Sequence, residues 1–264
     1  MTGPLESLRT TFDATAETYD RARPAYPPKL FDDLVALAAL EPGARLLEIG
    51  CATGKATLPL LQRGFVVVCV ELGPHLANRA RERLAGYAVE IHVEPFENWE
   101  GERQSFDLVF AATAWHWVDP AIRYRKAHEL LRPSGHLAFW SAGHAFPTGF
   151  DPFFTEIQAV YDALGESFEG EWPPLPPDQT PDDVAEIKAS GLFEEVHVRR
   201  YVWETLYTAN EYIALLNTFS GHIAMEPGKR DYLYTEIRSR IAAQSDRRIR
   251  RHWRATLHVA QPMR

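Results

Sequence analysis

Short apolar runs alternate with segments of helical spacing over the first half of the chain. Five runs predict strands: Ala44–Ile49, Phe65–Val70, Tyr87–Val93, Phe106–Ala112 and His136–Ser141. Helical patterns between them cover Thr53–Arg63, Pro74 to Gly86 and Asp119 to Leu131, and Arg132–Gly135 is predicted to form a turn. Strands that alternate with helices in this way pair in parallel through right-handed crossovers.

The pattern changes after Ser141. Helical patterns cover about Pro152–Leu164, Pro181–Ser190, Ala209–Ser220 and Gly228–Gln244, and alternating patterns predict strands over Glu195–Thr205 and Arg247–Ala260. We therefore expect a single α/β domain with a Rossmann-like, mostly parallel sheet of seven strands and helices on both faces. Residues 41–141 would form its ligand-binding core, and residues 142–180 and 209–245 would be lid insertions over a substrate.

Charge and composition narrow the choice of partners. The chain has 264 residues, 45% of them hydrophobic, and a formal net charge of −8 at pH 7. A surface for nucleic acid should be basic, so nucleic acid is not expected as a partner, and the basic run Arg247–Arg254 is interpreted as a solvated strand face. Neither a signal peptide nor a membrane-spanning run is recognisable, so we expect a cytoplasmic monomer or homodimer with no membrane partner.

The two cysteines, Cys51 and Cys69, lie in apolar stretches at strand ends. They are interpreted as reduced core residues. No spacing typical of metal ligands occurs, so no metal site is predicted.

A glycine-rich turn follows the first predicted strand. Over Leu46–Lys55 the sequence LLEIGCATGK ends a strand in small residues and starts a helix at once. Such a turn lets backbone N–H groups and a helix N-terminus approach a ligand closely. Glu71 directly follows the second strand, where a carboxylate suits the two hydroxyls of a ribose. Glu48 should have hydrogen-bond donors nearby, because an isolated buried charge is costly.

The spacing Glu48-x-Gly50-x-Ala52-x-Gly54 resembles the first motif of class I S-adenosylmethionine-dependent methyltransferases. Most members carry glycine where this chain has Ala52, whose methyl group disfavours a positive φ. A dinucleotide-binding fold would place a third glycine at position 55, which is lysine here. An NAD-dependent oxidoreductase on a related fold is therefore the less favoured alternative, and a non-catalytic member that only binds the cofactor is another.

The resemblance extends in the family's order over Phe12–Trp140. Glu94–Trp99 is similar to the family's loop beside the adenine, and Ala111–Trp117 to the segment that borders the site of methyl transfer. Leu130–Leu137 is similar to the turn before the fifth strand. The N-terminal segment, with Arg23-Pro24 and Tyr26-Pro27, resembles that of small-molecule methyltransferases such as the trans-aconitate and ubiquinone/menaquinone groups, which implies that residues 1–40 cover the cofactor.

The resemblance implies two adjoining sites. S-adenosyl-L-methionine, which becomes S-adenosyl-L-homocysteine, would be bound by Tyr19, Arg23, Glu48, Gly50, Cys51, Ala52, Thr53, Gly54, Glu71, Leu72, Phe96, Glu97, Thr113 and Ala114. A small-molecule acceptor would contact Trp115, His116, Trp117, Trp140, His144, Phe146 and His222.

His116 and Tyr19 are the candidate catalytic residues. Because the sulfonium already activates the methyl group, the protein mainly orients and desolvates the two partners. A general base is needed only if the attacking atom must lose a proton.

Overall fold

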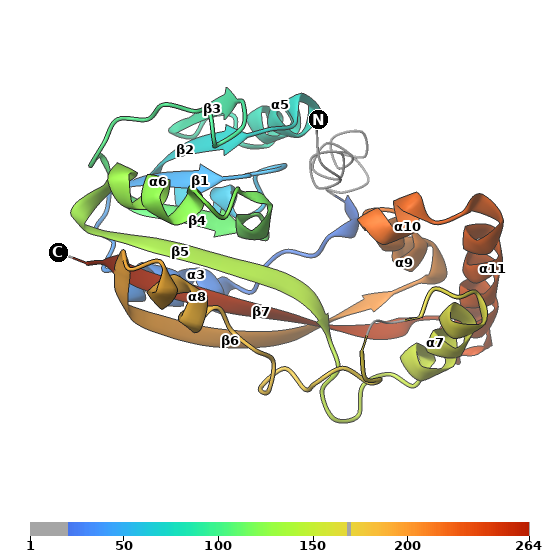
Figure 1. Cartoon of the computed structure of the whole chain (residues 1–264). Helices are drawn as coiled ribbons and strands as arrows, with labels where there is room; N and C mark the ends of the chain where they lie inside the picture. Colours follow the sequence, from blue (N-terminus) through green and yellow to red (C-terminus); the bar gives the residue numbers. More distant parts are fainter. Residues whose placement is uncertain (1–20, 168–169, 264) are drawn as a thin grey trace.

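The computed structural model describes residues 21–167 and 170–263 of the chain. Its centre is one seven-stranded sheet with the strand order β3-β2-β1-β4-β5-β7-β6 (Figure 1). The strands are β1 (Arg45–Ile49), β2 (Val66–Glu71), β3 (Val89–Val93), β4 (Phe106–Ala112), β5 (Leu131–Ala145), β6 (Phe193–Tyr207) and β7 (Ile249–Pro262). β1 to β5 pair in parallel and β7 runs antiparallel to both of its neighbours. The predicted Rossmann-like, mostly parallel sheet is therefore confirmed.

Helices cover both faces of this sheet. The helices in the described part of the chain are α3 (Pro28–Leu37), α4 (Thr57–Leu61), α5 (Pro74–Arg83), α6 (Arg123–Leu130), α7 (Phe153–Ala163), α8 (Val184–Ala189), α9 (Ala209–Leu216), α10 (Ser220–Ala224) and α11 (Pro227–Ala243). Side chains of α3, α4 and α5 share one apolar cluster with Leu46 of β1, and those of α6 and α8 share another with Leu47. Successive residues of a strand point to opposite faces, so the alternation within β1 separates the two clusters.

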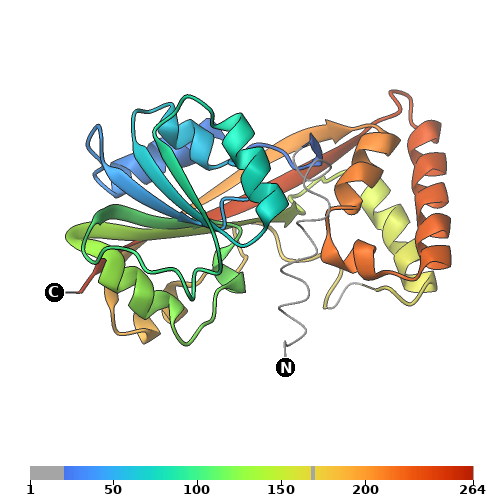
Figure 2. The same cartoon turned by 90° about the horizontal axis from the view of Figure 1, so that it is seen from above.

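The two ranges predicted as lid insertions supply a separate helical group. Figure 2 shows α7, α9, α10 and α11 gathered beyond one end of the sheet, where β6 and β7 extend toward them. A third apolar cluster joins α7, α9 and α11 to Ile249 and Trp253 of β7. This helical group, α7 with α9–α11, is thus attached to the sheet through the first half of β7.

The helix after the glycine-rich turn begins later than its apolar spacing predicts. α4 starts at Thr57 and not at Thr53. Ala52 and Gly54 have φ values of 48° and 78°, which a right-handed helix does not allow. The extra residues therefore form an open loop at the end of β1.

Two further boundaries differ from the sequence prediction. The predicted turn Arg132–Gly135 lies inside β5, where a shift in register against β4 accommodates the extra residues. The predicted helix Ala209–Ser220 is divided into α9 and α10, because Phe219 adopts an extended conformation with φ −100° and ψ 132°.

The described part of the N-terminal segment begins at Arg21. Within it α3 places Leu30, Phe31 and Leu34 in the apolar cluster with α4 and the sheet. This part of the predicted cofactor cover therefore packs on the sheet, and residues 1–20 lie outside the described residues.

Candidate active site

A cavity of about 360 Å³ opens beyond the carboxyl ends of β1 to β4. Gly50, Glu71, Glu94 and Thr113, which end or follow these four strands, line it together with Ser141 of β5. A smaller hollow of about 40 Å³ adjoins it. β1 and β4 are neighbours at the point where the strand order reverses, which is where ligands bind in open sheets of this kind.

Glu71 joins the end of β2 to the glycine-rich turn. Its Oε2 accepts a hydrogen bond from the backbone N–H of Ala52 at 2.7 Å, and its Oε1 accepts one from the N–H of Gly73 at 2.8 Å. The side chain is buried yet lines the cavity. Glu71 therefore links the end of β2 to the glycine-rich turn at the wall of the cavity.

The backbone of the turn is held in conformations that favour glycine. Gly50 has φ 70°, and a Cβ atom there would stand 2.7 Å from the Cβ of Ala114. Ala52 and Thr113 have φ 48° and 58° although they carry side chains, and both line the cavity. Strained residues of this kind gather at ligand sites. The Thr113 N–H donates to the carbonyl of Trp140 at 2.7 Å, which helps to hold it there.

Glu48 is a fully buried acid beside the smaller hollow. Its Oε2 accepts a hydrogen bond from the Thr57 hydroxyl at 2.6 Å, whereas Oε1 has no partner among the described residues. Burial raises the pKa of Glu48 to about 8, although the Thr57 hydroxyl opposes the shift; the charge of Glu71 raises it further. The side chain is therefore mostly protonated at pH 7 in the ligand-free protein.

Arg23 connects the N-terminal segment to the helical group. Its Nε donates to Thr218 Oγ1 and its Nη2 to the Thr218 carbonyl, both at 3.0 Å. Lys55 Nζ donates to the Arg23 carbonyl. Arg23 lines both the cavity and the hollow, so it borders the space between sheet and helices.

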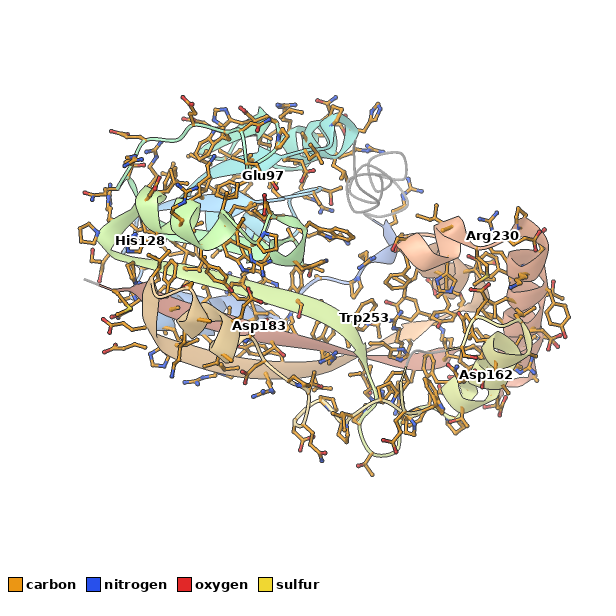
Figure 3. The ribbon with its side chains drawn as sticks, viewed as in Figure 1. Glu97, His128, Asp162, Asp183, Arg230 and Trp253 are labelled. Carbon is orange, nitrogen blue, oxygen red and sulfur yellow. The ribbon has the colours of Figure 1, made fainter. Side chains whose placement is uncertain are left out.

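The loop after β3 contributes a different acid from the predicted one. Glu94 and Phe96 line the cavity, but Glu97, labelled in Figure 3, does not. Its Oε1 instead accepts a hydrogen bond from the N–H of Asp119 at 3.2 Å.

A 3₁₀ turn over Trp115–Trp117 follows β4, and it directs some of its side chains to the cavity and one into the core. His116 and Trp117 line the cavity, whereas Trp115 is buried and stacks on Phe139 with ring centroids 5.2 Å apart. Partial burial, and then the charge of Arg123, lower the pKa of His116. Its imidazole is therefore neutral at pH 7 and able to accept a proton.

The other predicted acceptor residues lie away from the cavity. Trp140 is buried in the core and stacks on Phe110 at 5.8 Å, because its position in β5 points to the opposite face from Phe139. His144 packs on Phe146 with ring centroids 4.1 Å apart, and Phe146 lines a separate cavity of about 660 Å³.

His222 of α10 contacts the Tyr161 hydroxyl through Nε2 at 2.8 Å, inside the helical group. Among the remaining predicted cofactor residues, Leu72 and Ala114 line the cavity and Cys51 and Thr53 line the hollow. Gly54 supports the turn, since a Cβ there would stand 3.0 Å from Leu84. Tyr19 lies outside the described residues.

Comparison with known proteins agrees with this geometry. Residues 47–139 match the family model described as a methyltransferase domain. An uncharacterized methyltransferase of Mycobacterium tuberculosis is 36% identical over 143 residues, which cover 52% of this chain and 54% of that protein. Residues 47–139 thus form a methyltransferase domain, which supports the resemblance to class I S-adenosylmethionine-dependent methyltransferases.

Solved structures show the same fold as this methyltransferase domain and its extensions. A protein of Anaeromyxobacter dehalogenans, assigned as a type II methyltransferase, has a TM-score of 0.62 and 23% identity and covers 90% of this chain and 97% of that one. An S-adenosylmethionine-dependent methyltransferase of Geobacter sulfurreducens was solved with S-adenosyl-L-homocysteine. It has a TM-score of 0.53 and 15% identity, and the match covers 96% of this chain and 98% of that one. The matched part spans about half the length of the first curated relatives.

Several residues that line the cavity were not predicted from the sequence. Leu76 of α5, Ser141 and Ala142 of β5, and Phe219 and Ser220 beside α10 also line the cavity. Glu94 had a usable signal, because it directly follows β3 as Glu71 ends β2. Phe219 had only its aromatic character, and Ser220 had no signal, because only the folded helical group brings them to the sheet.

The described residues form neither a metal cluster nor a membrane-spanning helix. Within residues 21–167 and 170–263, no three side chains of histidine, cysteine, aspartate or glutamate are grouped closely enough to hold a metal ion. No helix in the same two stretches combines the length and the apolar character that crossing a membrane requires.

Proposed function

We propose that this protein transfers the methyl group of S-adenosylmethionine to a small-molecule acceptor in the cytoplasm. The match of residues 47–139 to the methyltransferase domain supports the reaction. The Geobacter protein with bound S-adenosyl-L-homocysteine supports the choice of cofactor. A net charge of −8 supports a small molecule over nucleic acid as the acceptor.

One observation carries the proposal: the Glu71 carboxylate is 2.7 Å from the Ala52 N–H of the glycine-rich turn. The two parts predicted to hold one adenosyl ligand thus meet in a single cavity. The Glu71 carboxylate lines this cavity and suits the ribose hydroxyls, and Phe96 and Leu72 supply an apolar wall for the adenine.

The residues around the smaller hollow fit the amino-acid end of the cofactor. The buried, unpartnered Oε1 of Glu48 suits the ammonium group, because a cation there would satisfy an otherwise orphaned acceptor. The guanidinium of Arg23 suits the carboxylate.

When bound, the sulfonium supplies a methyl group that is already activated, so the protein has to position and desolvate the acceptor. Trp117 and Phe219 form the apolar side of the cavity where that acceptor would lie. His116, neutral at pH 7, is the described residue best placed to take a proton from an acceptor that must lose one.

Calorimetry with S-adenosyl-L-homocysteine tests the cofactor assignment. Glu71→Ala should weaken binding by about one to two orders of magnitude, since a hydrogen bond to a charged group contributes roughly 1.5–3 kcal/mol. Glu97→Ala is the matched control, because that acid follows β3, the strand beside β2, but does not line the cavity, and it should leave the affinity unchanged.

Equal affinity of the wild type and the Glu71→Ala variant would contradict the ribose assignment. A larger thermal shift with NADH than with S-adenosyl-L-homocysteine would favour an oxidoreductase. Tight cofactor binding without methyl transfer to any compound of an acceptor library would favour a non-catalytic member of the family.

A further inference from the structure

Arg251 is a buried cation without an acidic partner. It is 4% exposed and lies on the face of β7 that also carries Ile249 and Trp253, whereas the adjacent Arg250 is exposed. The prediction that the whole run Arg247–Arg254 is solvated is therefore wrong at Arg251. Its Nε has no hydrogen-bond partner, and it joins none of the ion pairs among residues 21–167 and 170–263.

Aromatic rings contact the Arg251 guanidinium instead. Its central carbon lies 4.1 Å from the ring centroid of Trp253 and 5.3 Å from that of Phe219. Figure 3 shows Trp253 where β7 passes from the sheet to the helical group. A ring face attracts the positive charge but does not replace an oxygen acceptor for the five N–H donors of a guanidinium. The N–H donors of Arg251 therefore remain available to a ligand.

The polar groups that surround Arg251 are hydroxyls, a second guanidinium and the imidazoles of His144 and His222. Tyr212, Tyr207, Arg23 and Tyr161 are its main electrostatic neighbours. The Tyr207 hydroxyl is buried; Trp253 and Thr205 lie near its oxygen, but none of the described residues is in place to accept its proton. Phenolic hydroxyls can donate to an anion, so the surroundings of Arg251 suit a negative group.

The acids of the same elements are already engaged. Glu204 of β6 lies 3.5 Å from Arg250 Nε and 3.7 Å from His252 Nε2. Glu166, which interacts with His222, pairs with Lys229 at 2.9 Å. The interior around Arg251 is therefore positive.

Phe219 separates this positive interior from the methyltransferase cavity. Its ring contacts Arg251 and also lies 4.3 Å from the Arg23 guanidinium, and Phe219 and Arg23 both line the cavity. None of the residues of α10, which Phe219 precedes, is buried. Phe219 itself is only partly buried, and turning it aside would open Arg251 to the acceptor side of the cavity.

We propose that Arg251 recognises a carboxylate on the methyl acceptor, with the Tyr207 hydroxyl as a second donor and Phe219 displaced by the bound molecule. This inference rests on the proposed function. A planar guanidinium binds a carboxylate through two parallel hydrogen bonds, and the buried site strengthens them. An acceptor with a single negative group fits this site best, because the neighbouring guanidinium of Arg23 already donates two hydrogen bonds to Thr218.

Calorimetry on the full chain saturated with S-adenosyl-L-homocysteine tests this assignment. Acetate, hexanoate and benzoate are titrated, each alongside its amide, and inorganic phosphate is titrated separately. At least one acid should bind roughly tenfold tighter than its amide, and phosphate should not bind. Arg251→Met should weaken that acid by roughly tenfold or more and leave the affinity for S-adenosyl-L-homocysteine unchanged.

Arg250→Met is the matched control, since it removes an exposed arginine from the adjacent position and should change neither affinity. The inference is overturned if no acid binds better than its amide, or if phosphate binds as tightly as the acids. Equal loss of S-adenosyl-L-homocysteine binding in Arg251→Met would also overturn it, because Arg251 would then serve the cofactor.

If Arg251→Met does not fold, the calorimetric affinities of the wild type for the acids and their amides decide whether the inference holds. Absence of S-adenosyl-L-homocysteine binding to the wild type would contradict the proposed function itself. A preference for acids can still be measured in that case, so the two failures are distinguishable.

Discussion

At the scale of single residues, two acids at the same site have opposite surroundings. Glu71 accepts two backbone N–H groups and faces the cavity, whereas Glu48 is fully buried with one oxygen unpartnered. Burial is costly for a charged carboxylate and much less so for a protonated one. The ligand-free site therefore holds a neutral acid at Glu48 that a bound cation would favour in its charged form.

Glu48 should make stability depend on pH. Its pKa is about 8 in the folded protein against an ordinary value of 4.5, so between these values the folded state retains a proton that the unfolded chain releases. Stability should therefore fall as pH rises from 4.5 to 8. Urea unfolding of Glu48→Gln, which stays neutral, should show a shallower fall than the wild type. Glu102→Gln, an exposed control, should follow the wild type.

Two glycines with similar backbone angles, one before β1 and one in the glycine-rich turn, separate the stability cost of the backbone conformation from that of side-chain packing. Gly43 and Gly54 both have φ near 80°, but a Cβ atom meets nothing within 4 Å at Gly43 and stands 3.0 Å from Leu84 at Gly54. Gly43→Ala should cost about 1 kcal/mol from the backbone alone, and Gly54→Ala about 1 kcal/mol more. Ala52→Gly, at φ 48°, should change stability by less than about 1 kcal/mol. If denaturant titrations show equal losses of unfolding free energy for the two alanine variants, the contact with Leu84 adds no cost at Gly54.

At the scale of elements, the helices of the helical group differ in how much of their surface is buried and in how their ends are capped. α11 buries Leu233, Tyr234, Ile237 and Ile241, whereas α10 buries no residue. α9 begins with a capping box between Thr208 and Glu211, but α10 has no side-chain cap. Few buried contacts and an uncapped start give a segment little local stability.

Hydrogen exchange should show this difference. Backbone amides of α10 should exchange at least about tenfold faster than those in the middle of α11, because a local opening of α10 exposes little apolar surface. Mass spectrometry of deuterated peptides measures both segments in one experiment. Comparable protection of the two helices would argue that α10 is fixed and that Phe219 does not move.

At the scale of the whole molecule, the parallel half of the sheet was predictable and the helical group was much less so. Phe65–Val70 and Phe106–Ala112 are apolar runs whose burial follows from local sequence, and both form strands within a residue of the prediction. Glu71 was predictable as part of the site, because the ends of parallel strands meet at one edge. Trp140 was not, because the face that a strand residue adopts depends on register.

Arg251 shows the same limit more sharply. A run with five arginines looks solvated, and only its alternation with Ile249 and Trp253 places Arg251 with apolar neighbours. Whether that face is covered depends on α9 and α11, which lie apart in the chain and fold against β7. Burial of a polar residue by distant elements leaves no local signal.

The length of β7 has a consequence for how such a protein can change. From Ala255 onward its buried side chains pack in the sheet's own apolar clusters. Its first residues, Ile249–Arg251, pair with β6 alone, and Ile249 packs with the helices. Exchanging Arg251 or its alternate neighbours would alter which compounds are accepted while the machinery shared by the family stays intact. One continuous strand thus lets selectivity diversify independently of the reaction.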